Sequence, residues 1–508
     1  MSRFEEISSE FNVLNPDHGF LIEGKPGSGK SASIIEPIHY QSILAGASGM
    51  IYDWKGAFDM TLGKSAYNYW NNAEEEVKSN LQVKFVNYLN PLITSKVNLL
   101  ELDSIENNLL LDENIDILFK NLEKEWIKKT DFWAQNAISY GKGCAMFLRD
   151  YYPEYCDLGH MISLALTDFD VFLEAVIQTE DVQLMNVMKP LITAYKQDAE
   201  SQISGAVSTT QLPLTSMNNK EIYWVHSAED PKEYISLDVS NKVNPTLLIL
   251  GNHKPMKKAI TPALSVLMSQ ITNYINQPGK NLSLFSVDEL PTTYIKDLDE
   301  LPATGRSNKV ITLLAIQTFS QLVDIYGKEK ADKIRENLGN QIIGRCSPAT
   351  AKYFSDYLGK VEARNLSYSK NSGGRGENTA SKEKSVLQAR EIGGQEIGHF
   401  TGEISGGKPP FFHAQFEYFD YKKLTGNEIE DIPILNIPKV FKESYEGIND
   451  EKNQKKRETK IIDFKEMLLQ YYDNKMTENF DRVNENIEKI MQPFAKIAEA
   501  KRARKKSA

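Results

Sequence analysis

Short apolar runs alternate with segments of helical length over the first hundred residues and again after residue 245. Runs of this length are typical of buried strands, and their alternation with helices is typical of a parallel sheet covered on both faces. The pattern therefore predicts an α/β fold. The predicted strands are 19–22, 49–53, 83–86, 246–250, 281–289, 310–316 and 342–344.

Strand signals stop between residues 100 and 217, where long helical patterns such as 131–150 and 161–196 take over. Since strand patterns resume after this region, the helical part interrupts the sheet in sequence. The sequence therefore predicts an inserted all-α domain over 100–217.

Three features follow the last predicted strand. The segment 367–385 is rich in Ser, Asn, Gly and Lys, which predicts an exposed mobile loop. The phenylalanine-rich segment 395–419 predicts a closing pair of strands. Segment 424–438 carries Asn, Asp and Pro and is expected to be irregular.

The C-terminal region has a heptad seam followed by a basic tail. Its apolar residues are spaced 3, 4, 3, 4 and 3 apart: Phe480, Val483, Ile487, Ile490, Phe494 and Ile497. The seam is short, so packing on its own domain competes with a coiled coil. The tail 501–506 is either a frayed, solvated end or a contact for nucleic acid or anionic lipid.

Composition narrows the class of protein. The formal net charge of −10 does not favour nucleic-acid binding by the chain as a whole, so such binding would need local basic surface. Three scattered cysteines make no disulfide framework, and the seven histidines show no metal-ligand spacing. No apolar run has the length of a membrane helix, and the polar first residues do not form a signal peptide.

One motif predicts nucleotide binding. The stretch after the first strand reads Gly24-Lys25-Pro26-Gly27-Ser28-Gly29-Lys30-Ser31 and matches the P-loop pattern. A strand precedes it, and a helix is expected over 32–44, kinked or shortened by Pro37. Backbone N–H groups and the helix N-terminus would bind phosphate oxygens, Lys30 would reach the β- and γ-phosphates, and Ser31 would hold Mg²⁺. The expected ligand is ATP or GTP with Mg²⁺.

Acidic and amide residues follow two later strands. Asp288 is placed to support Mg²⁺, directly or through water, and Glu289 to orient and partly deprotonate the attacking water. Gln317, at the end of the next strand, is expected on the γ-phosphate side.

Several blocks resemble the type IV coupling proteins of conjugation and type IV secretion, the TraG/TraD kind. The match runs from about residue 19 to 420 and keeps the order of that family. Its blocks are the P-loop with Ile35-Glu36-Pro37, Ile51-Tyr52-Asp53-Trp54-Lys55-Gly56, Val287-Asp288-Glu289-Leu290-Pro291, Gly305-Arg306-Ser307, Ala315-Ile316-Gln317-Thr318-Phe319-Ser320-Gln321-Leu322 with Tyr326-Gly327, and 350–359.

The resemblance implies a RecA-like P-loop ATPase domain with an inserted all-α domain, assembled as a ring-shaped hexamer. Such a ring would sit at the cytoplasmic face of the bacterial inner membrane, at the mouth of a secretion channel. Its implied partners are a relaxase–DNA complex or effector proteins, single- or double-stranded DNA, and inner-membrane channel components. The domain map becomes 1–99 and 218–423 for the two parts of the RecA-like domain, 100–217 for the insert, and 424–508 for the C-terminal linker, helix and tail.

By the same resemblance, Arg306 is the arginine finger offered to the nucleotide of a neighbouring subunit, with Arg335 and Arg345 as rivals. The segment 292–304 between Asp288 and Arg306 has the length of a helix, which would carry Arg306 away from its own P-loop.

Two positions depart from the family. Its members usually begin with two membrane helices, which this sequence lacks, so the chain is expected to be a trimmed piece or a membrane-free variant. Trp54 stands where the family tends to have proline, which alters only the shape of that turn.

Two other functions stay open on sequence alone. One is a docking receptor whose ATP site mainly holds a ring together. The other is a P-loop small-molecule kinase or GTPase, against which stand the large helical insert and the missing Asn-Lys-x-Asp motif of GTPases.

Overall fold

A mainly parallel nine-stranded sheet is the centre of the computed structural model, which describes residues 15–56, 61–100, 108–197, 200–371, 374–407, 410–450 and 452–507. The strand order is β11-β10-β7-β1-β6-β5-β2-β4-β3. The strands are β1 Phe20–Glu23, β2 Ser48–Asp53, β3 Gln82–Asn87, β4 Thr246–Gly251, β5 Ser283–Val287, β6 Val310–Ile316, β7 Asn340–Ile343, β10 His399–Glu403 and β11 Phe411–Gln415. All seven strands predicted from apolar runs are present, and the pair predicted within 395–419 forms β10 and β11.

The chain divides into two compact units. The P-loop unit comprises Met1–Ser42, Ser286–Pro291 and Asp299–Glu428; the helical unit comprises Ile43–Phe285, Thr292–Leu298 and Ile429–Ala508.

In the P-loop unit, β1 runs parallel to β6 and β7, and β10 pairs antiparallel with β7 and β11. Every residue of β1, β6 and β7 is buried, as expected for strands covered on both faces. The helices are α1 Glu36–Leu44, α14 Leu301–Thr304, α15 Phe319–Asn337, α16 Pro348–Tyr357, α17 Ala389–Gly393 and α18 Tyr421–Thr425, with short 3₁₀ turns η1 Pro16–His18, η7 Leu290–Thr292 and η8 Gly305–Asn308.

The helix after the P-loop begins with a π-helical turn, η2 Ser31–Ile35, before α1. Pro37 is the second residue of α1, close to the helix start, where a missing N–H is tolerated. The helix predicted over 32–44 is thus confirmed, with Pro37 at the change from π- to α-helical geometry.

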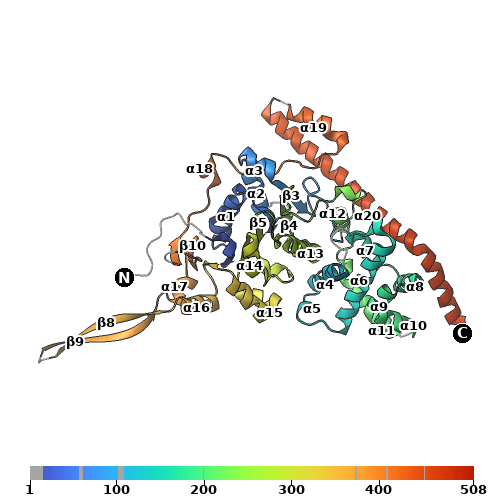
Figure 1. Cartoon of the computed structure of the whole chain (residues 1–508). Helices are drawn as coiled ribbons and strands as arrows, with labels where there is room; N and C mark the ends of the chain where they lie inside the picture. Colours follow the sequence, from blue (N-terminus) through green and yellow to red (C-terminus); the bar gives the residue numbers. More distant parts are fainter. Residues whose placement is uncertain are drawn as a thin grey trace. The chain divides into compact units, whose positions relative to one another are not determined.

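Two of the predicted elements are wrong. The segment 367–385 is not an irregular loop: β8 Lys360–Asn371 pairs antiparallel with β9 Gly374–Ser385 in a hairpin next to α16 and α17 (Figure 1). The segment 292–304 is not one helix, because only the four residues of α14 are α-helical and turns make up most of the rest.

The helical unit contains β2, β3, β4, most of β5 and the majority of the helices. Those are α2 Thr61–Asn71, α3 Glu75–Asn80, α4 Asn108–Leu122, α5 Glu125–Lys128, α6 Phe132–Tyr151, α7 Leu158–Ala165, α8 Phe169–Thr179, α9 Val182–Val187, α10 Lys189–Lys196, α11 Glu200–Thr215, α12 Lys220–His226, α13 Lys257–Ile275, α19 Lys442–Asn449 and α20 Gln454–Ser507. The helices α6 to α11 lie together in Figure 1. The long pattern over 161–196 is divided among several helices, with Asp168 and Asp181 capping two of them.

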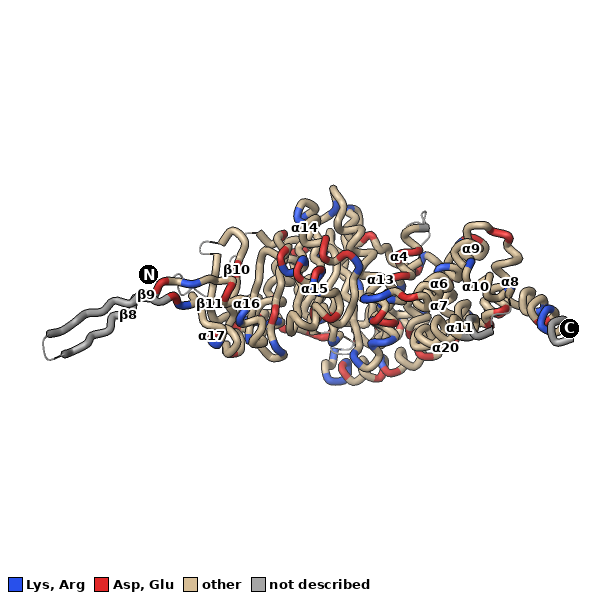
Figure 2. Tube along the Cα trace, turned by 90° about the horizontal axis from the view of Figure 1, so that it is seen from below, with Lys and Arg blue, Asp and Glu red and all other residues tan. Residues whose placement is uncertain are grey.

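The heptad seam lies on α20 and packs on its own unit. Val483 and Ile487 are buried, and the rings of Phe480 and Phe494 contact Tyr223 and Phe147. The basic tail is helical up to Ser507. Its first two basic residues pair with acidic residues of α8 and its N-cap: Lys501 with Glu174, and Arg502 with Asp168 and Asp170. Figure 2 shows the end of α20 beside α8.

Candidate functional site

The P-loop is a turn made possible by glycine backbone conformations. Gly27 and Gly29 have φ of 72° and 93°, in the left-handed region that favours glycine. The backbone N–H of Ser28 donates to the carbonyl of Lys25 over 3.1 Å, which closes the turn. Lys25 and Pro26 are exposed on its outside, and Ser31 is half-buried where the helix begins.

Buried polar groups line the P-loop. The Lys30 side chain is 9% exposed, and its ammonium donates to the Gly24 carbonyl. The hydroxyls of Ser28 and Ser33 are buried and have no hydrogen-bond partner within the described residues. A buried hydroxyl without a partner costs free energy, and phosphate oxygens would accept from it. These donors fit the phosphates of a nucleotide.

The acidic side of the site lies where β5 and β6 end. Asp288 and Glu289 directly follow β5 and are half-buried. The side-chain amide of Gln317 donates to Oε2 of Glu289 over 2.6 Å, so the structure brings these two predicted residues together. Glu289 has φ of 63°, a backbone conformation that costs a non-glycine residue on the order of 1–3 kcal/mol.

Glu23, which sequence analysis missed, connects three segments beneath the P-loop. It ends β1, is 1% exposed, and its carboxylate accepts from three donors: Phe319 N–H at 3.1 Å, Thr350 Oγ1 at 2.6 Å and Arg335 Nη2 at 3.2 Å. Burial raises the pKa of Glu23, while the Thr350 hydroxyl, the Arg335 charge and the Phe319 N–H oppose that shift. In the sequence, the only sign of this cluster is a carboxylate at the end of an otherwise apolar run.

The guanidinium of Arg335 is enclosed. It lies 3.3 Å from the centroid of the Phe319 ring and 4.4 Å from that of Tyr353. With its ion pair to Glu23, this cation–π arrangement occupies the group inside its own unit. Arg335 is therefore held inside its own unit by an ion pair and two aromatic rings.

Arg306 lies at the N-terminal end of β6, whereas the P-loop lies at the C-terminal end of the parallel strands. It is exposed on η8, which packs against η1 before β1 begins. Because β1 and β6 are parallel, with Glu23 opposite Ile316, the P-loop follows the end of both strands while Arg306 precedes β6. The seven residues of β6 rise about 3.3 Å each, so roughly 20 Å of strand separates the two ends. Arg345 is on the P-loop side, where its carbonyl accepts from Lys25 N–H over 2.8 Å.

The segment before β10 and the segment after β11 contact the P-loop and the helix turn that follows it through backbone hydrogen bonds. Gly398 N–H donates to the Ser28 carbonyl over 3.0 Å, and Phe419 N–H donates to the Ala32 carbonyl over 2.8 Å. A Cβ on Gly29 would lie 3.1 Å from the Gly398 nitrogen, so two glycines allow this approach. Sequence analysis missed this contact, because only the pair of glycines marks it.

Asp53, in the motif Asp53-Trp54-Lys55-Gly56, caps a helix in the helical unit. Its carboxylate accepts from the N–H groups of Leu62 and Gly63, at 3.0 and 3.2 Å, near the start of α2. Asp53 thus anchors the first turn of that helix.

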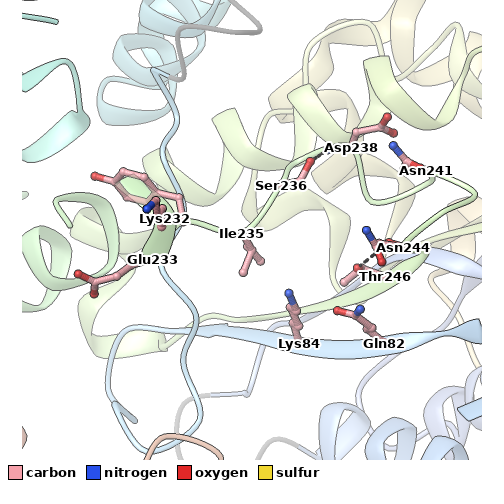
Figure 3. Close-up of a pocket in the computed structure, with 11 residues that line it drawn as sticks. Gln82, Lys84, Lys232, Glu233, Ile235, Ser236, Asp238, Asn241, Asn244 and Thr246 are labelled. Atoms are coloured by element: carbon pink, nitrogen blue, oxygen red, sulfur yellow. Dashed lines mark hydrogen bonds between the residues drawn. The ribbon is translucent and has the colours of Figure 1, made fainter. Parts of the chain in front are cut away.

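A polar cavity of about 380 Å³ lies elsewhere, in the helical unit (Figure 3). Gln82 and Thr246, the first residues of β3 and β4, line it, and Lys84 points into it below Ile235. Its carboxylates are paired, Glu233 with Lys96 and Asp238 with Lys280. Lys84 and Lys232 have no ion pair within the described residues, which leaves the cavity positively charged; burial lowers the pKa of Lys84.

Within the described residues, no group of three or more His, Cys, Asp and Glu side chains could hold a metal ion. Nor does any helix there have both the length and the apolar composition needed to cross a membrane.

Residues 283–396 match the family model described as the TraM recognition site of TraD and TraG. Among solved structures, the unbound monoclinic form of the bacterial conjugative coupling protein TrwBdeltaN70 is similar, with a TM-score of 0.60 and 16% identity over 82% of this chain and 90% of that chain. The plasmid coupling protein TrwB in complex with ADP and Mg²⁺ has a TM-score of 0.59 and 16% identity over the same shares. TrwB in complex with the non-hydrolysable ATP analogue ADPNP has a TM-score of 0.56 and 16% sequence identity, over 82% of this chain and 91% of that chain.

No curated protein matches the chain. The predicted fold class is confirmed: an α/β RecA-like P-loop ATPase fold with an all-α domain, shared with TrwB. With residues 283–396 matching the family model as well, the resemblance to the type IV coupling proteins indicated by the sequence is confirmed.

Proposed function

We propose that the chain is a coupling ATPase that recruits a relaxase–DNA complex or effector proteins to a type IV secretion channel and uses ATP hydrolysis to drive or license their transfer. The ligands are ATP and Mg²⁺, the latter neutralising charge on the phosphates when bound. TrwB has been solved with ADP and Mg²⁺ and with an ATP analogue, which supports this choice.

Each residue of the site has a chemical role in this proposal. The backbone from Gly24 to Ser31 cradles the phosphates, and Lys30 contributes its positive charge at the β- and γ-phosphates. Ser31 and Asp288 hold the metal. Glu289 orients the attacking water and accepts its proton, as hydrolysis of a phosphoanhydride needs positioned charge and an oriented nucleophile. Gln317 holds the Glu289 carboxylate in position.

We further propose that catalysis needs a ring, with Arg306 serving the neighbouring nucleotide. The placement of Arg306 supports this, because it precedes β6 whereas the P-loop of its own chain follows the far ends of β1 and β6. A guanidinium stabilises charge on the transferring phosphoryl group. A homo-hexamer is the expected assembly.

The cargo side of the proposal rests on the segment match. The matching family model is described as the site at which TraD and TraG recognise TraM, and this supports a protein-docking role for residues 283–396. The helical insert 100–217 is the proposed part that selects cargo. DNA and inner-membrane channel components are the other proposed partners, at the cytoplasmic face of the bacterial inner membrane.

The hydrogen bond from Gln317 to Glu289, beside a P-loop in the same compact unit, is the observation that carries the ATPase proposal. Phosphate release and ADP binding should be measured for the wild type, Lys30→Ala and Lys328→Ala, with and without single-stranded DNA. Lys328 is an exposed lysine of α15 and serves as the matched control. We expect Lys30→Ala to lose turnover and bind nucleotide weakly while Lys328→Ala is unchanged. Full turnover by a folded Lys30→Ala protein would reject the site.

A further inference from the structure

The order of strands gives the nucleotide site two distinct sides. In the sheet, β6 and β5 lie on one side of β1, and β7, β10 and β11 lie on the other side. Glu289 directly follows β5 and Gln317 directly follows β6, so both residues belong to the first side. A nucleoside triphosphate is an elongated molecule. If its γ-phosphate faces Glu289, its base extends toward the side of β7, β10 and β11.

On that side, two backbone segments are fastened to the P-loop and to the helix turn after it. The turn before β10 is held by Gly398 N–H on the Ser28 carbonyl, and the segment after β11 by Phe419 N–H on the Ala32 carbonyl. Gly398 also accepts from Phe416 N–H over 2.8 Å, and the Gln415 side-chain amide donates to the Ile397 carbonyl over 3.1 Å. The two segments therefore form one frame with the P-loop.

Aromatic contacts fix the second segment further. The Tyr40 ring of α1 lies 5.4 Å from the Phe419 ring and 5.9 Å from that of Tyr421, between centroids. Phe416 contacts Phe400 edge to face. The residues on either side of Tyr418 are thus anchored, which leaves the Tyr418 ring on a rigid support.

One large apolar side chain on each segment is exposed. Ile397 is 51% exposed and Tyr418 is 59% exposed. Scattered exposed apolar residues are ordinary, but these two project from backbone that is hydrogen-bonded to the phosphate-binding loop. An aromatic ring and an aliphatic side chain are the groups that bind the two faces of a nucleobase.

We propose that Tyr418 and Ile397 form the base subsite of the nucleotide site and bind the purine ring of ATP. The inference rests on the proposed ATPase function, since it uses the same P-loop. It adds the residues that hold the nucleoside end, none of which follows from the P-loop motif.

The test compares ADP, which carries a base and a ribose on its phosphates, with inorganic tripolyphosphate, which carries neither. Their dissociation constants should be measured by calorimetry for the wild type, Tyr418→Ala, Tyr418→Phe and Ile397→Ala. Tyr151→Ala, which removes an exposed tyrosine of α6 in the helical unit, is the matched control.

Loss of base stacking should weaken ADP binding by Tyr418→Ala about 10-fold, with a smaller loss for Ile397→Ala. Tripolyphosphate binding should stay the same, Tyr418→Phe should bind ADP like the wild type, and Tyr151→Ala should change neither ligand. If Tyr418→Ala and Ile397→Ala bind ADP normally, the base subsite is wrong while the P-loop assignment stands. If the wild type binds neither ligand, the proposed function itself fails.

A third outcome assigns the surface to another occupant. If Tyr418→Ala leaves ADP affinity unchanged but lowers the oligomeric mass measured by sedimentation, the ring contacts a neighbouring subunit. That result would overturn the base subsite.

Discussion

The amide of Gln317 donates a hydrogen bond to the carboxylate of Glu289 over 2.6 Å, although the two residues come from the ends of different strands. A hydrogen bond donated to a carboxylate stabilises its charged form. Gln317 thus both orients the Glu289 carboxylate and favours its charged form. Glu289 also has a left-handed backbone conformation, with φ of 63° directly after the end of β5.

Replacement of Glu289 by glutamine should separate binding from hydrolysis. Glu289→Gln keeps the size of the side chain and removes the base, so we expect normal binding of ATP with Mg²⁺ and turnover at least ~10²-fold slower. Single-turnover phosphate release measures the effect, with the exposed Glu329→Gln of α15 as control. Normal turnover by Glu289→Gln would move the water-positioning role to another residue.

Loss of the Gln317 amide should lower the rate and leave nucleotide binding intact. In Gln317→Ala the Glu289 carboxylate loses the donor that holds it in position, so we expect a lower kcat with an unchanged affinity for ATP. The measurement is single-turnover phosphate release in the wild type, Gln317→Ala, Glu289→Gln and the double variant. Independent, additive losses in the double variant would show that Gln317 does not act through Glu289.

Arg306→Ala should lose turnover and keep ATP affinity, because the residue lies at the strand end away from its own P-loop. Fingers supplied by another chain are worth ~10³–10⁵ in rate, and specific activity of the wild type should rise with protein concentration. Mixing Arg306→Ala with Lys30→Ala should restore part of the activity, since some interfaces then pair an intact finger with an intact P-loop. If mixed rings are shown to form and no activity is recovered, Arg306 serves the nucleotide of its own subunit or only the fold.

Glu23→Gln should destabilise the P-loop unit. It leaves the buried Arg335 guanidinium without its counter-charge, a change that typically costs about 3–5 kcal/mol. Urea unfolding of Glu23→Gln, Arg335→Met and the double variant gives the coupling energy, and the double variant should be less destabilised than the sum. The exposed pair Lys328–Asp332 provides a comparison, and Asp332→Asn should cost under ~1 kcal/mol. Additive effects at Glu23 and Arg335 would contradict a coupled pair.

Stability should fall as the pH drops below neutrality. Burial lowers the pKa of His39 to about 3 and that of His226 to about 4, so both stay uncharged in the fold. Below the unfolded pKa near 6.5, the unfolded chain binds protons that the native chain does not bind. The stability contributed by the two uncharged histidines is therefore fully present above pH 6.5 and is lost as the pH falls toward 4. Each histidine should add about 1.4 kcal/mol per pH unit to the slope of the unfolding free energy.

Replacing His39 tests this slope directly. Its Nε2 lies 2.8 Å from the Ser286 hydroxyl, an arrangement that a glutamine amide can imitate. The unfolding free energy of His39→Gln from pH 7 to 5 should vary less steeply than that of the wild type. An equal slope would mean that His39 takes up its proton without unfolding.

The local parts of this fold were predictable. Apolar runs marked every parallel strand, and the P-loop motif needs only contiguous residues. The Glu23 cluster was not predictable, because Thr350 and Phe319 reach it across 327 and 296 positions of sequence. A motif cannot describe donors that only the folded sheet brings together.

The two wrong elements have physical reasons. The hairpin β8/β9 is held by antiparallel backbone pairing, which requires no apolar run, so a polar composition hid it. In the segment 292–304, Tyr294 exchanges backbone hydrogen bonds with the Asn121 side chain of α4, at 2.9 Å in both directions. Tertiary contacts therefore replace the helical bonds that its length suggested.

The separation of Arg306 from Lys30 by the length of a strand also limits the symmetry that an assembly of several copies can have. A two-fold dimer places one and the same patch of both copies in contact, whereas a finger and a nucleotide site at opposite ends of parallel strands favour a head-to-tail contact. Head-to-tail contacts continue until they close. An open row of copies then has one complete site fewer than it has members, and closure of the ring supplies the last one.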